Sequence, residues 1–379
     1  MNPSLTDASA DEPNGTRVHA LDHLRALAML AGVLFHAALA YSPLLHPWWP
    51  AADRQHAPLI DALVWLPHLV RMPLFFLVAG YFSASLLQRR GMSGLARQRV
   101  RRILLPFLVA WPLVHLSVAM ATGWAAEATL YPSPLLQMVR EWMAMPDAQA
   151  PPPGTGHLWF LHYLLLFGVL HWVGRVLELG GLLQRWLALG MPWVALSLPL
   201  LLWPGFALTS APHPAPEGLL PQFWAIGVYG PFYALGVALF GRLESLDSLR
   251  RWLLPATFAC LLAYALFLRA LGVVLVPGNA SWDVAALQAL IAGWATLACL
   301  VFGLRALAQP RAWLRYLAAS AYWTYLMHLP LLFAIQYLLM DLNWPWPAKF
   351  AFAVSATLVL CVVSYEILVR RTPLRRWVG

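Results

Sequence analysis

The segment DHLRALAMLAGVLFHAALAYS, residues 22–42, decides the fold of this chain. Between Arg25 and His36 it holds ten residues without a polar side chain. The segment is as long as the roughly 20 residues that a helix needs to cross the hydrocarbon core of a membrane. The positions that fall on one face of such a helix are Asp22, Arg25, Met29, Gly32 and His36. The segment therefore predicts a transmembrane helix with a polar stripe.

The rest of the sequence repeats this apolar pattern, and we predict an all-α integral membrane protein with about ten transmembrane helices. Of the 379 residues, 61% are hydrophobic and only 11% are charged. About a quarter of the residues of a soluble protein are charged, so a soluble fold is excluded. The predicted spans are roughly 22–42, 61–86, 103–123, 158–177, 187–204, 222–240, 252–272, 284–304, 316–338 and 349–369.

Successive loops alternate between arginine-rich and arginine-poor, and the richest is Arg89–Arg102. The positive-inside rule then places both termini in the cytoplasm, and we expect the chain to lie in the inner membrane. We predict a polar, disordered tail at residues 1–20, a membrane domain at 21–372 and a basic tail at 373–379. No cleavage site follows the first span, which we expect to stay as an anchor. Because the net charge of +9 is spread over these loops, it indicates topology and not nucleic-acid binding.

Ionisable side chains inside the spans are candidates for function, because a charge at the centre of a bilayer costs roughly 2.5–3.5 kcal/mol or more. Arg25 lies near the cytoplasmic end of the first span, and His36 lies about 16 Å further across the membrane. In the second span His68 falls near the depth of His36, and Arg71 lies about one turn deeper. The Arg71 guanidinium needs an anion, which can be a neighbouring carboxylate in a structural ion pair or the carboxylate or phosphate of a ligand.

Further candidates lie at the ends of the spans and at mid-depth. The arginine-rich loop Arg89–Arg102 carries more arginines than membrane topology requires. Within it, Arg99 and Arg102 are one helical turn apart and can bind a phosphorylated ligand from the cytoplasm. The other candidates are His157 and Trp159 at an outer mouth, Tyr325 and His328 at mid-depth, and Glu366 near the inner end of the last span.

The remaining histidines and the cysteines predict no metal site. No histidine pair has the spacing of an HExxH motif, and the three cysteines are far apart in apolar runs, so neither a metal site nor a disulfide framework is expected. We assign the other histidines to termini, loops or aromatic packing: His19, His23, His46, His56, His115, His162, His171 and His213.

The sequence resembles the acyltransferase-3 family of membrane enzymes. The Arg and His that this family carries in its first helix, separated by ten residues, are matched by Arg25 and His36. The family's Phe-Phe-x-x-Ser-Gly-Phe/Tyr motif is matched by residues 75–81, with an alanine where serine is usual. Its Arg-x-x-Arg at the entry to the third span is matched by Arg99 and Arg102.

The resemblance implies an O-acyltransferase that moves an acyl group from cytoplasmic acyl-CoA to hydroxyls of a periplasmic glucan or another glycan. Acyl-CoA is then a co-substrate, succinyl-CoA before acetyl-CoA, and no bound cofactor is expected. The expected catalytic residues are His36 as general base or acyl carrier, Arg25, and Asp22, which is expected to balance the charge of Arg25. Arg99 and Arg102 are expected to bind CoA. The expected residues for the acyl group or the acceptor are Arg71, His68, His157, Trp159, Tyr325, His328 and Glu366.

Succinyl is preferred because a buried carboxylate needs a cation such as Arg71, which an acetyl group does not. Expected partners are membrane lipids and the glycan, with proteins of glucan synthesis or a second copy of the chain as further candidates, and no nucleic acid.

Two other classes of function stay open. A transporter or flippase of a glycan or lipid-linked sugar predicts matched broken helices in two halves, which the sequence lacks. A non-enzymatic membrane partner leaves Arg25, His36 and Arg71 unexplained.

Overall fold

The computed structural model describes residues 13–149, 152–271 and 279–378, and every regular element in these ranges is a helix. The α-helices are α1 (Pro13–Ala38), α2 (Pro58–Arg99), α3 (Leu105–Ala128), α4 (Pro134–Met143), α5 (Trp159–Val176), α6 (Gly180–Ala188), α7 (Met191–Ala207), α8 (Phe223–Leu239), α9 (Leu253–Leu271), α10 (Trp282–Ala306), α11 (Ala312–Met340), α12 (Trp346–Ser364) and α13 (Arg375–Val378). The 3-10 helices are η1 (Leu39–Tyr41), η3 (Gly156–Leu158) and η4 (Leu243–Trp252), and the π-helices are η2 (Val100–Leu104) and η5 (Tyr365–Arg370).

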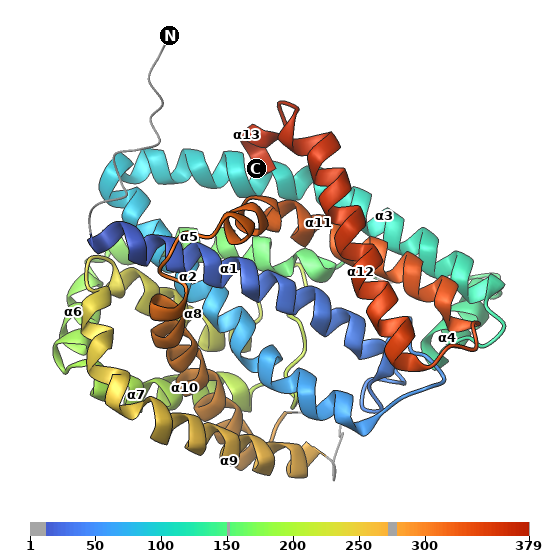
Figure 1. Cartoon of the computed structure of the whole chain (residues 1–379), viewed down its shortest axis with the longest axis horizontal. Helices are drawn as coiled ribbons and strands as arrows, with labels where there is room; N and C mark the ends of the chain where they lie inside the picture. Colours follow the sequence, from blue (N-terminus) through green and yellow to red (C-terminus); the bar gives the residue numbers. More distant parts are fainter. Residues whose placement is uncertain (1–12, 150–151, 272–278, 379) are drawn as a thin grey trace.

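The predicted spans agree with these helices to within a few residues at their ends. The exception is the span 187–204, which begins in α6 and crosses the break before α7. Residue 272 of the span 252–272 lies outside the described residues. Within the described ranges, seven helical stretches are long and apolar enough to cross a membrane, and α7 and α8 are shorter apolar helices. One of the seven stretches covers the 71 residues Pro58–Ala128. It breaks at Gly91, whose φ of 64° is left-handed, and α2 and α3 run in opposite directions from there (Figure 1). The described residues confirm the all-helical class, and the seven long apolar stretches are consistent with an integral membrane protein. The number of crossings and the side of the termini stay predictions.

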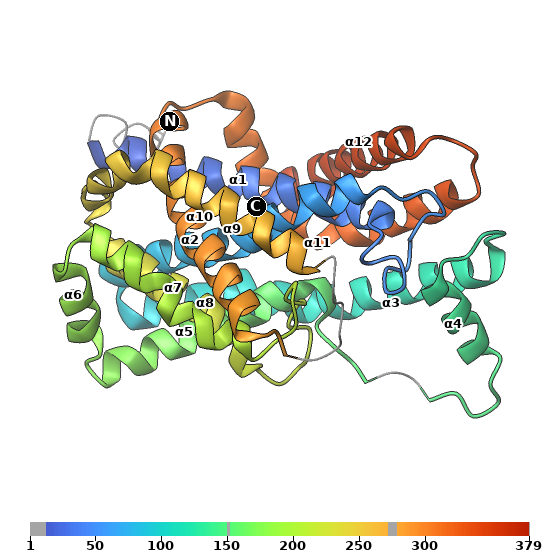
Figure 2. The ribbon, with the colours of Figure 1, turned by 90° about the horizontal axis from the view of Figure 1, so that it is seen from below.

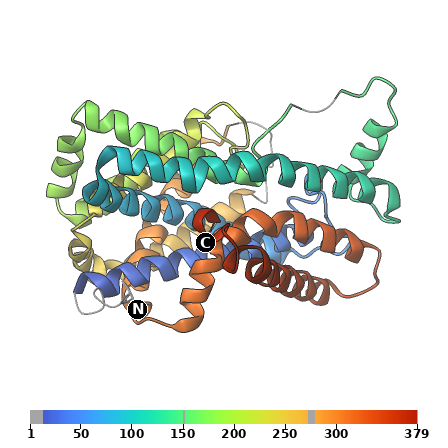
Figure 3. The same cartoon turned by 90° about the horizontal axis from the view of Figure 1, so that it is seen from above.

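Segments from the two sets of predicted loops lie at opposite ends of the molecule. The start of α1, the turn between α2 and α3 and helix α6 gather at one end (Figure 1). The loop after η1, helix α4 and the turn between α11 and α12 gather at the other. Figures 2 and 3 show the same separation from two further sides. This grouping agrees with the alternation of arginine-rich and arginine-poor loops, and we call the two ends the arginine end and the α4 end.

Both segments predicted as tails contain helical residues in the structure. Residues 1–12 lie outside the described residues, but helix α1 already begins at Pro13, so the second half of the predicted disordered tail is helical. Proline is favoured in the first turn of a helix because its missing N–H has no partner there anyway. The basic segment at 373–379 likewise contains the short helix α13.

Helices α2 and α8 cross at close range because each carries a glycine at the contact. A Cβ on Gly80 would collide with the carbonyl of Tyr233, and a Cβ on Gly236 would collide with the carbonyl of Leu77. Small residues at such crossings let helix backbones approach in a membrane, where lipid supplies no hydrophobic drive for association. This crossing fixes the position of α2, which carries His68 and Arg71.

A buried ion pair anchors the loop after η1. Lys349 Nζ lies 2.6 Å from Asp53 Oδ2, and the two side chains are 0% and 3% exposed. Asp53 also accepts a hydrogen bond from the backbone N–H of Gln55 at 2.9 Å. The pair therefore ties the first turn of α12 to the loop that carries Trp49 and Pro50.

Removing one partner of this pair is expected to destabilise the fold. Lys349→Met leaves the Asp53 carboxylate buried without a cation, and we expect it to lower the free energy of unfolding by about 3 kcal/mol. Unfolding of the purified protein in detergent, by heat or denaturant, measures the loss. The double variant Lys349→Met/Asp53→Leu buries no charge and should recover most of the stability. Equal stability of wild type and Lys349→Met would contradict this role of the pair.

Candidate active site

A cavity of about 1310 Å³ runs between α1, α2, α3, α5 and α11. Its lining includes His19 and His36 of α1, which are about 25 Å apart along the helix axis. Towards the arginine end it is lined by Arg25, Arg89, Arg90, Arg99, Arg102 and Arg315, and towards the α4 end by Trp48, Trp49, Pro50 and Leu135. Pockets for small molecules usually measure about 300–1,000 Å³. This cavity therefore has room for two substrates at once.

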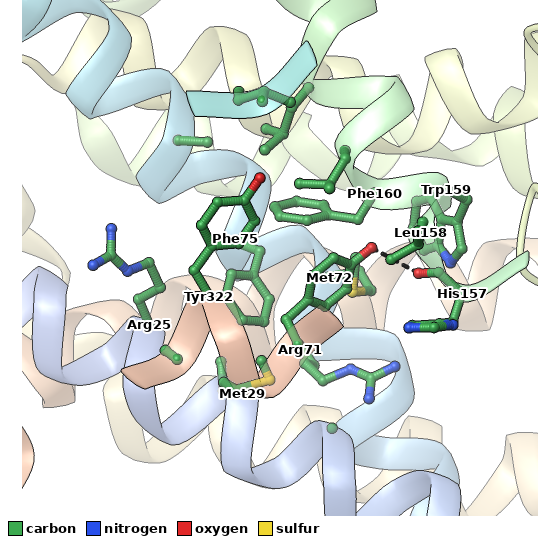
Figure 4. A pocket seen from close by; sticks show the side chains of 18 of the residues that line it. Arg25, Met29, Arg71, Met72, Phe75, His157, Leu158, Trp159, Phe160 and Tyr322 are labelled. Atoms are coloured by element: carbon green, nitrogen blue, oxygen red, sulfur yellow. Dashed lines mark hydrogen bonds between the residues drawn. The ribbon is translucent and has the colours of Figure 1, made fainter. Parts of the chain in front are cut away.

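Arg71 of α2 reaches into the middle of this cavity (Figure 4). The residue is only 9% exposed, and its Nε is buried without a hydrogen-bond partner. The ion pairs found among the described residues include those of Arg25, Lys349 and Arg370, and none of these three involves Arg71. Its guanidinium carbon instead lies 4.8 Å from the centroid of the Phe35 ring. Of the two explanations for Arg71, a structural ion pair is therefore unsupported, and a ligand anion is favoured.

Three histidines from distant parts of the chain meet beside Arg71. They are His36 of α1, His157 of η3 and His328 of α11. The ring centroids of His36 and His328 are 5.4 Å apart, and those of His157 and His328 are 5.3 Å apart. Nδ1 of His36 and Nε2 of His328 are buried without a hydrogen-bond partner. Imidazole nitrogens with free lone pairs in a cavity are suited to take a proton from a substrate.

Proline explains why His157 sits against α11. Pro330 has no backbone N–H, so the carbonyl of Leu326, one turn earlier, lacks its usual helical partner. His157 Nε2 lies 3.3 Å from this carbonyl oxygen. The hydroxyl of Tyr325 donates in return to the backbone carbonyl of His157 at 2.7 Å. These two bonds hold the start of α5 on α11 at the cavity wall.

The arginine end of the cavity is held by local contacts. Arg25 Nη2 lies 3.2 Å from Asp22 Oδ1, which confirms the predicted pair one turn apart. Arg99 donates to the hydroxyl of Ser83 and lies 3.4 Å from that of Tyr233. The π-helix η2 begins directly after Arg99, and such wide turns change the direction of side chains and often occur at functional sites. Arg102 within η2 is exposed at the cavity mouth.

Comparison with known proteins identifies the family. A family described as an acyltransferase domain, acyltransferase-3, matches residues 18–366. The chain belongs to the acyltransferase-3 family. Glucans biosynthesis protein C of Escherichia coli, in strains SMS-3-5 / SECEC and K12, is 36% identical over 106 residues.

The aligned part is 26% of this chain and 25% of these relatives, so the chain spans about a quarter of the length of the curated relatives it matches. No solved structure matches the chain.

In this member of the acyltransferase-3 family, all but one of the predicted site residues line the same cavity. They are Asp22, Arg25, His36, His68, Arg71, Arg99, Arg102, His157, Trp159, Tyr325 and His328. The exception is Glu366, which lies outside the cavity lining. Glu366 pairs with Arg370 at 2.8 Å and accepts a hydrogen bond from the hydroxyl of Tyr316 at 2.6 Å. Its grouping with the substrate-binding residues is thus not supported, because partners one turn away and on α11 already satisfy the carboxylate.

His213, which we assigned to packing from the sequence, contacts the cavity residue His68. Its ring stacks on that of His68 with centroids 4.3 Å apart, and its backbone carbonyl lies 2.9 Å from His68 Nε2. Burial lowers the pKa of His213 to about 4, so its ring is neutral at pH 7. No sequence signal could have linked these residues, because His213 follows His68 by 145 positions. Tyr229 and Tyr322, whose hydroxyls are buried and unpartnered, are cavity residues that the sequence also left unassigned.

Gly32 of α1 leaves room for Arg71. A Cβ at this position would lie 3.0 Å from Arg71 Nη1. We expect Gly32→Ala to displace the guanidinium and to lower acyl transfer about 10-fold, while α1 becomes more stable by up to about 1 kcal/mol. Rates of transfer and unfolding curves in detergent measure both effects.

The control is Gly174→Ala on α5, where a Cβ would meet nothing within 4 Å. It should gain similar helix stability and keep full activity. If Gly32→Ala also keeps full activity, the position of the Arg71 guanidinium does not matter for transfer.

Proposed function

We propose that this protein is a multi-pass O-acyltransferase of the bacterial inner membrane, which moves an acyl group from cytoplasmic acyl-CoA to hydroxyls of a periplasmic glucan or another glycan. One observation carries the proposal: a single cavity joins an arginine-lined end to a buried Arg71 and a cluster of histidines. Such a cavity suits a donor with phosphates at one end and a reacting acyl group at the other.

The donor would enter at the arginine end. Arg99 and Arg102 would bind the phosphates of CoA, which arginine recognises through its planar set of donors. The uncharged pantetheine arm would then follow the polar stripe of α1 past Arg25. From there to His36 the distance along the helix is about 16 Å.

Succinyl is the acyl group that fits Arg71 best. The guanidinium is buried, and the described residues provide it with no carboxylate. The free carboxylate of a succinyl group would supply the missing anion with two parallel hydrogen bonds. An acetyl group has no such carboxylate and would leave Arg71 as an uncompensated buried charge.

The transfer itself needs a base and an exit for the proton. His36 would take the proton of a sugar hydroxyl as its oxygen attacks the thioester carbonyl. The C–S bond then breaks, and the proton passes from His36 to the departing thiolate, so that CoA leaves as the thiol. In the alternative route the acyl group rests on His36 before the sugar hydroxyl attacks it.

The acceptor would approach from the α4 end. Trp48 and Trp49 line the cavity there, and their rings offer flat apolar faces on which sugar rings can stack. The E. coli relatives are named glucans biosynthesis protein C, and this name supports a glucan as the acceptor.

A donor comparison tests this function. The purified protein is incubated with isotope-labelled succinyl-CoA or acetyl-CoA and a periplasmic glucan extract, and the glucan is analysed by mass spectrometry. We expect succinyl ester on the glucan and a much slower acetyl transfer. Faster acetyl transfer would overturn the choice of donor. If neither CoA ester binds, the acyltransferase proposal fails and a transporter becomes the better explanation.

The role of Arg99 predicts a selective loss of donor affinity. We expect Arg99→Gln to raise the KM for acyl-CoA about 10-fold with little change in kcat, because a charge-assisted contact to phosphate contributes roughly 1.5–3 kcal/mol. Arg97→Gln is the matched control, since Arg97 lies on the same helix, is exposed and does not line the cavity. Equal effects of the two substitutions would show general electrostatic attraction and not a phosphate site.

A further inference from the structure

The C-terminal segment takes part in a second hollow, which is lined mainly by arginines. This hollow measures about 510 Å³, and it is lined by Arg102, Arg371, Thr372, Pro373, Arg375 and Arg376. Its four arginines are exposed, and none of these six residues is acidic. Arg102 belongs to η2, whereas the other five residues follow η5. This C-terminal hollow therefore gathers positive charge from two distant parts of the chain.

Backbone hydrogen bonds and one buried side chain hold the C-terminal segment in place. The N–H of Thr372 donates to the carbonyl of Val369 at 3.2 Å, and the N–H of Arg375 donates to the carbonyl of Thr372 at 3.2 Å. Val378 in α13 is 5% exposed and belongs to the same hydrophobic core as Ile103 of η2. Helix α13 contacts η2 (Figure 1). The arginines of the segment are thus presented by a packed part of the fold.

Such a group of like charges favours an anionic ligand. Like charges that line one hollow repel one another, and an anion among them replaces repulsion by attraction. Glu366 is the nearest acidic residue in sequence to the C-terminal arginines, but its carboxylate already accepts hydrogen bonds from Arg370 at 2.8 Å and Tyr316 at 2.6 Å. A phosphate monoester carries a charge of about −1.5 to −2 at pH 7, and arginine recognises its oxygens through a planar set of donors.

Arg102 connects the C-terminal hollow with the site of the proposed acyl transfer, because it lines both this hollow and the large cavity. CoA branches in a matching way: its diphosphate continues into the pantetheine arm, whereas its 3′-phosphate projects from the ribose. We infer that the C-terminal hollow binds the 3′-phosphate of acyl-CoA, while the diphosphate and the pantetheine arm follow the cavity. This inference rests on the proposed function and adds Arg371, Arg375 and Arg376 to the residues that recognise the donor.

Binding of CoA with and without its 3′-phosphate tests this inference. We expect calorimetric titration of the purified wild type in detergent to show about 10-fold tighter binding of CoA than of 3′-dephospho-CoA, because charge-assisted contacts to phosphate are strong. Arg375→Gln/Arg376→Gln should bind CoA about 10-fold more weakly and should bind 3′-dephospho-CoA like the wild type. The matched control is Arg97→Gln/Arg101→Gln, which removes two exposed charges that line neither the cavity nor the C-terminal hollow. It should keep the preference for CoA.

Equal affinity of the wild type for the two ligands would overturn the inference. Equal losses for both ligands in Arg375→Gln/Arg376→Gln would also overturn it, because they indicate general electrostatic attraction. A lipid headgroup is the other source of phosphate, and unfolding in nanodiscs of phosphatidylglycerol or phosphatidylcholine tests it. If phosphatidylglycerol stabilises the wild type but not this variant, and both prefer CoA equally, the hollow binds lipid and the inference fails. In each of these cases CoA still binds and the proposed function stands, whereas a wild type that binds no CoA overturns both.

Discussion

His36→Ala should abolish acyl transfer, with a loss of at least about 1,000-fold in kcat, while acyl-CoA still binds. The expected size follows from the loss of general base or nucleophilic catalysis, which contribute about 100- to 10,000-fold. Binding should survive, because Arg99 and Arg102, which are proposed to hold CoA, line the arginine end of the cavity together with Arg25, and Arg25 lies about 16 Å from His36 along α1. The measurement combines transfer kinetics by mass spectrometry with equilibrium binding of acyl-CoA.

The control for this substitution is His162→Ala, which removes a histidine that does not line the cavity. It should keep its transfer rate within about two-fold of wild type, as surface and packing changes away from a site usually do. If His36→Ala retains more than about a tenth of the wild-type rate, His36 is neither the base nor the acyl carrier.

Arg71→Met should lower succinyl transfer about 1,000-fold and change acetyl transfer far less. The difference arises because only the succinyl group carries a carboxylate, which would be buried in the variant without its cation at a cost of several kcal/mol. Arg71→Lys keeps the charge but loses the planar pair of donors, so its succinyl transfer should fall between those of the wild type and Arg71→Met.

Stability provides an independent check on Arg71. The described residues provide no counter-charge for this guanidinium, so Arg71→Met should keep or raise the unfolding temperature of the substrate-free protein. Lys349→Met, which breaks a true buried pair, should lower it. Equal losses of succinyl and acetyl transfer in Arg71→Met would contradict a carboxylate-binding role.

The sequence predicted the helices and the local pairs of this protein well. A lipid environment requires each spanning segment to satisfy its own backbone hydrogen bonds, so every long apolar run had to be a helix. The pair of Asp22 and Arg25 was predictable because residues three apart share a helix face. The resemblance in the first span similarly drew attention to His36, which lines the cavity.

Contacts between distant segments could not be predicted in this way. The sequence placed His328 at mid-depth but gave no reason for its ring to face His36, and it assigned His213 to packing although this ring stacks on His68. It grouped Glu366 with the substrate site, whereas Tyr316 and Arg370 satisfy that carboxylate outside the cavity. Such pairings depend on how α1, α2, α8 and α11 cross. Glycines such as Gly80 allow close backbone contacts at a crossing, and the local sequence pattern does not predict these contacts.

Transfer across a sealed membrane tests the role of the cavity most directly. The protein is reconstituted in one orientation into lipid vesicles, with labelled succinyl-CoA on one face and glucan on the other, since neither compound crosses the lipid. We expect glucan ester to form when the donor is on the face of Arg99 and Arg102 and the acceptor is on the face of Trp48 and Trp49. Product only when donor and acceptor share one face would show that the cavity does not carry the acyl group across the membrane.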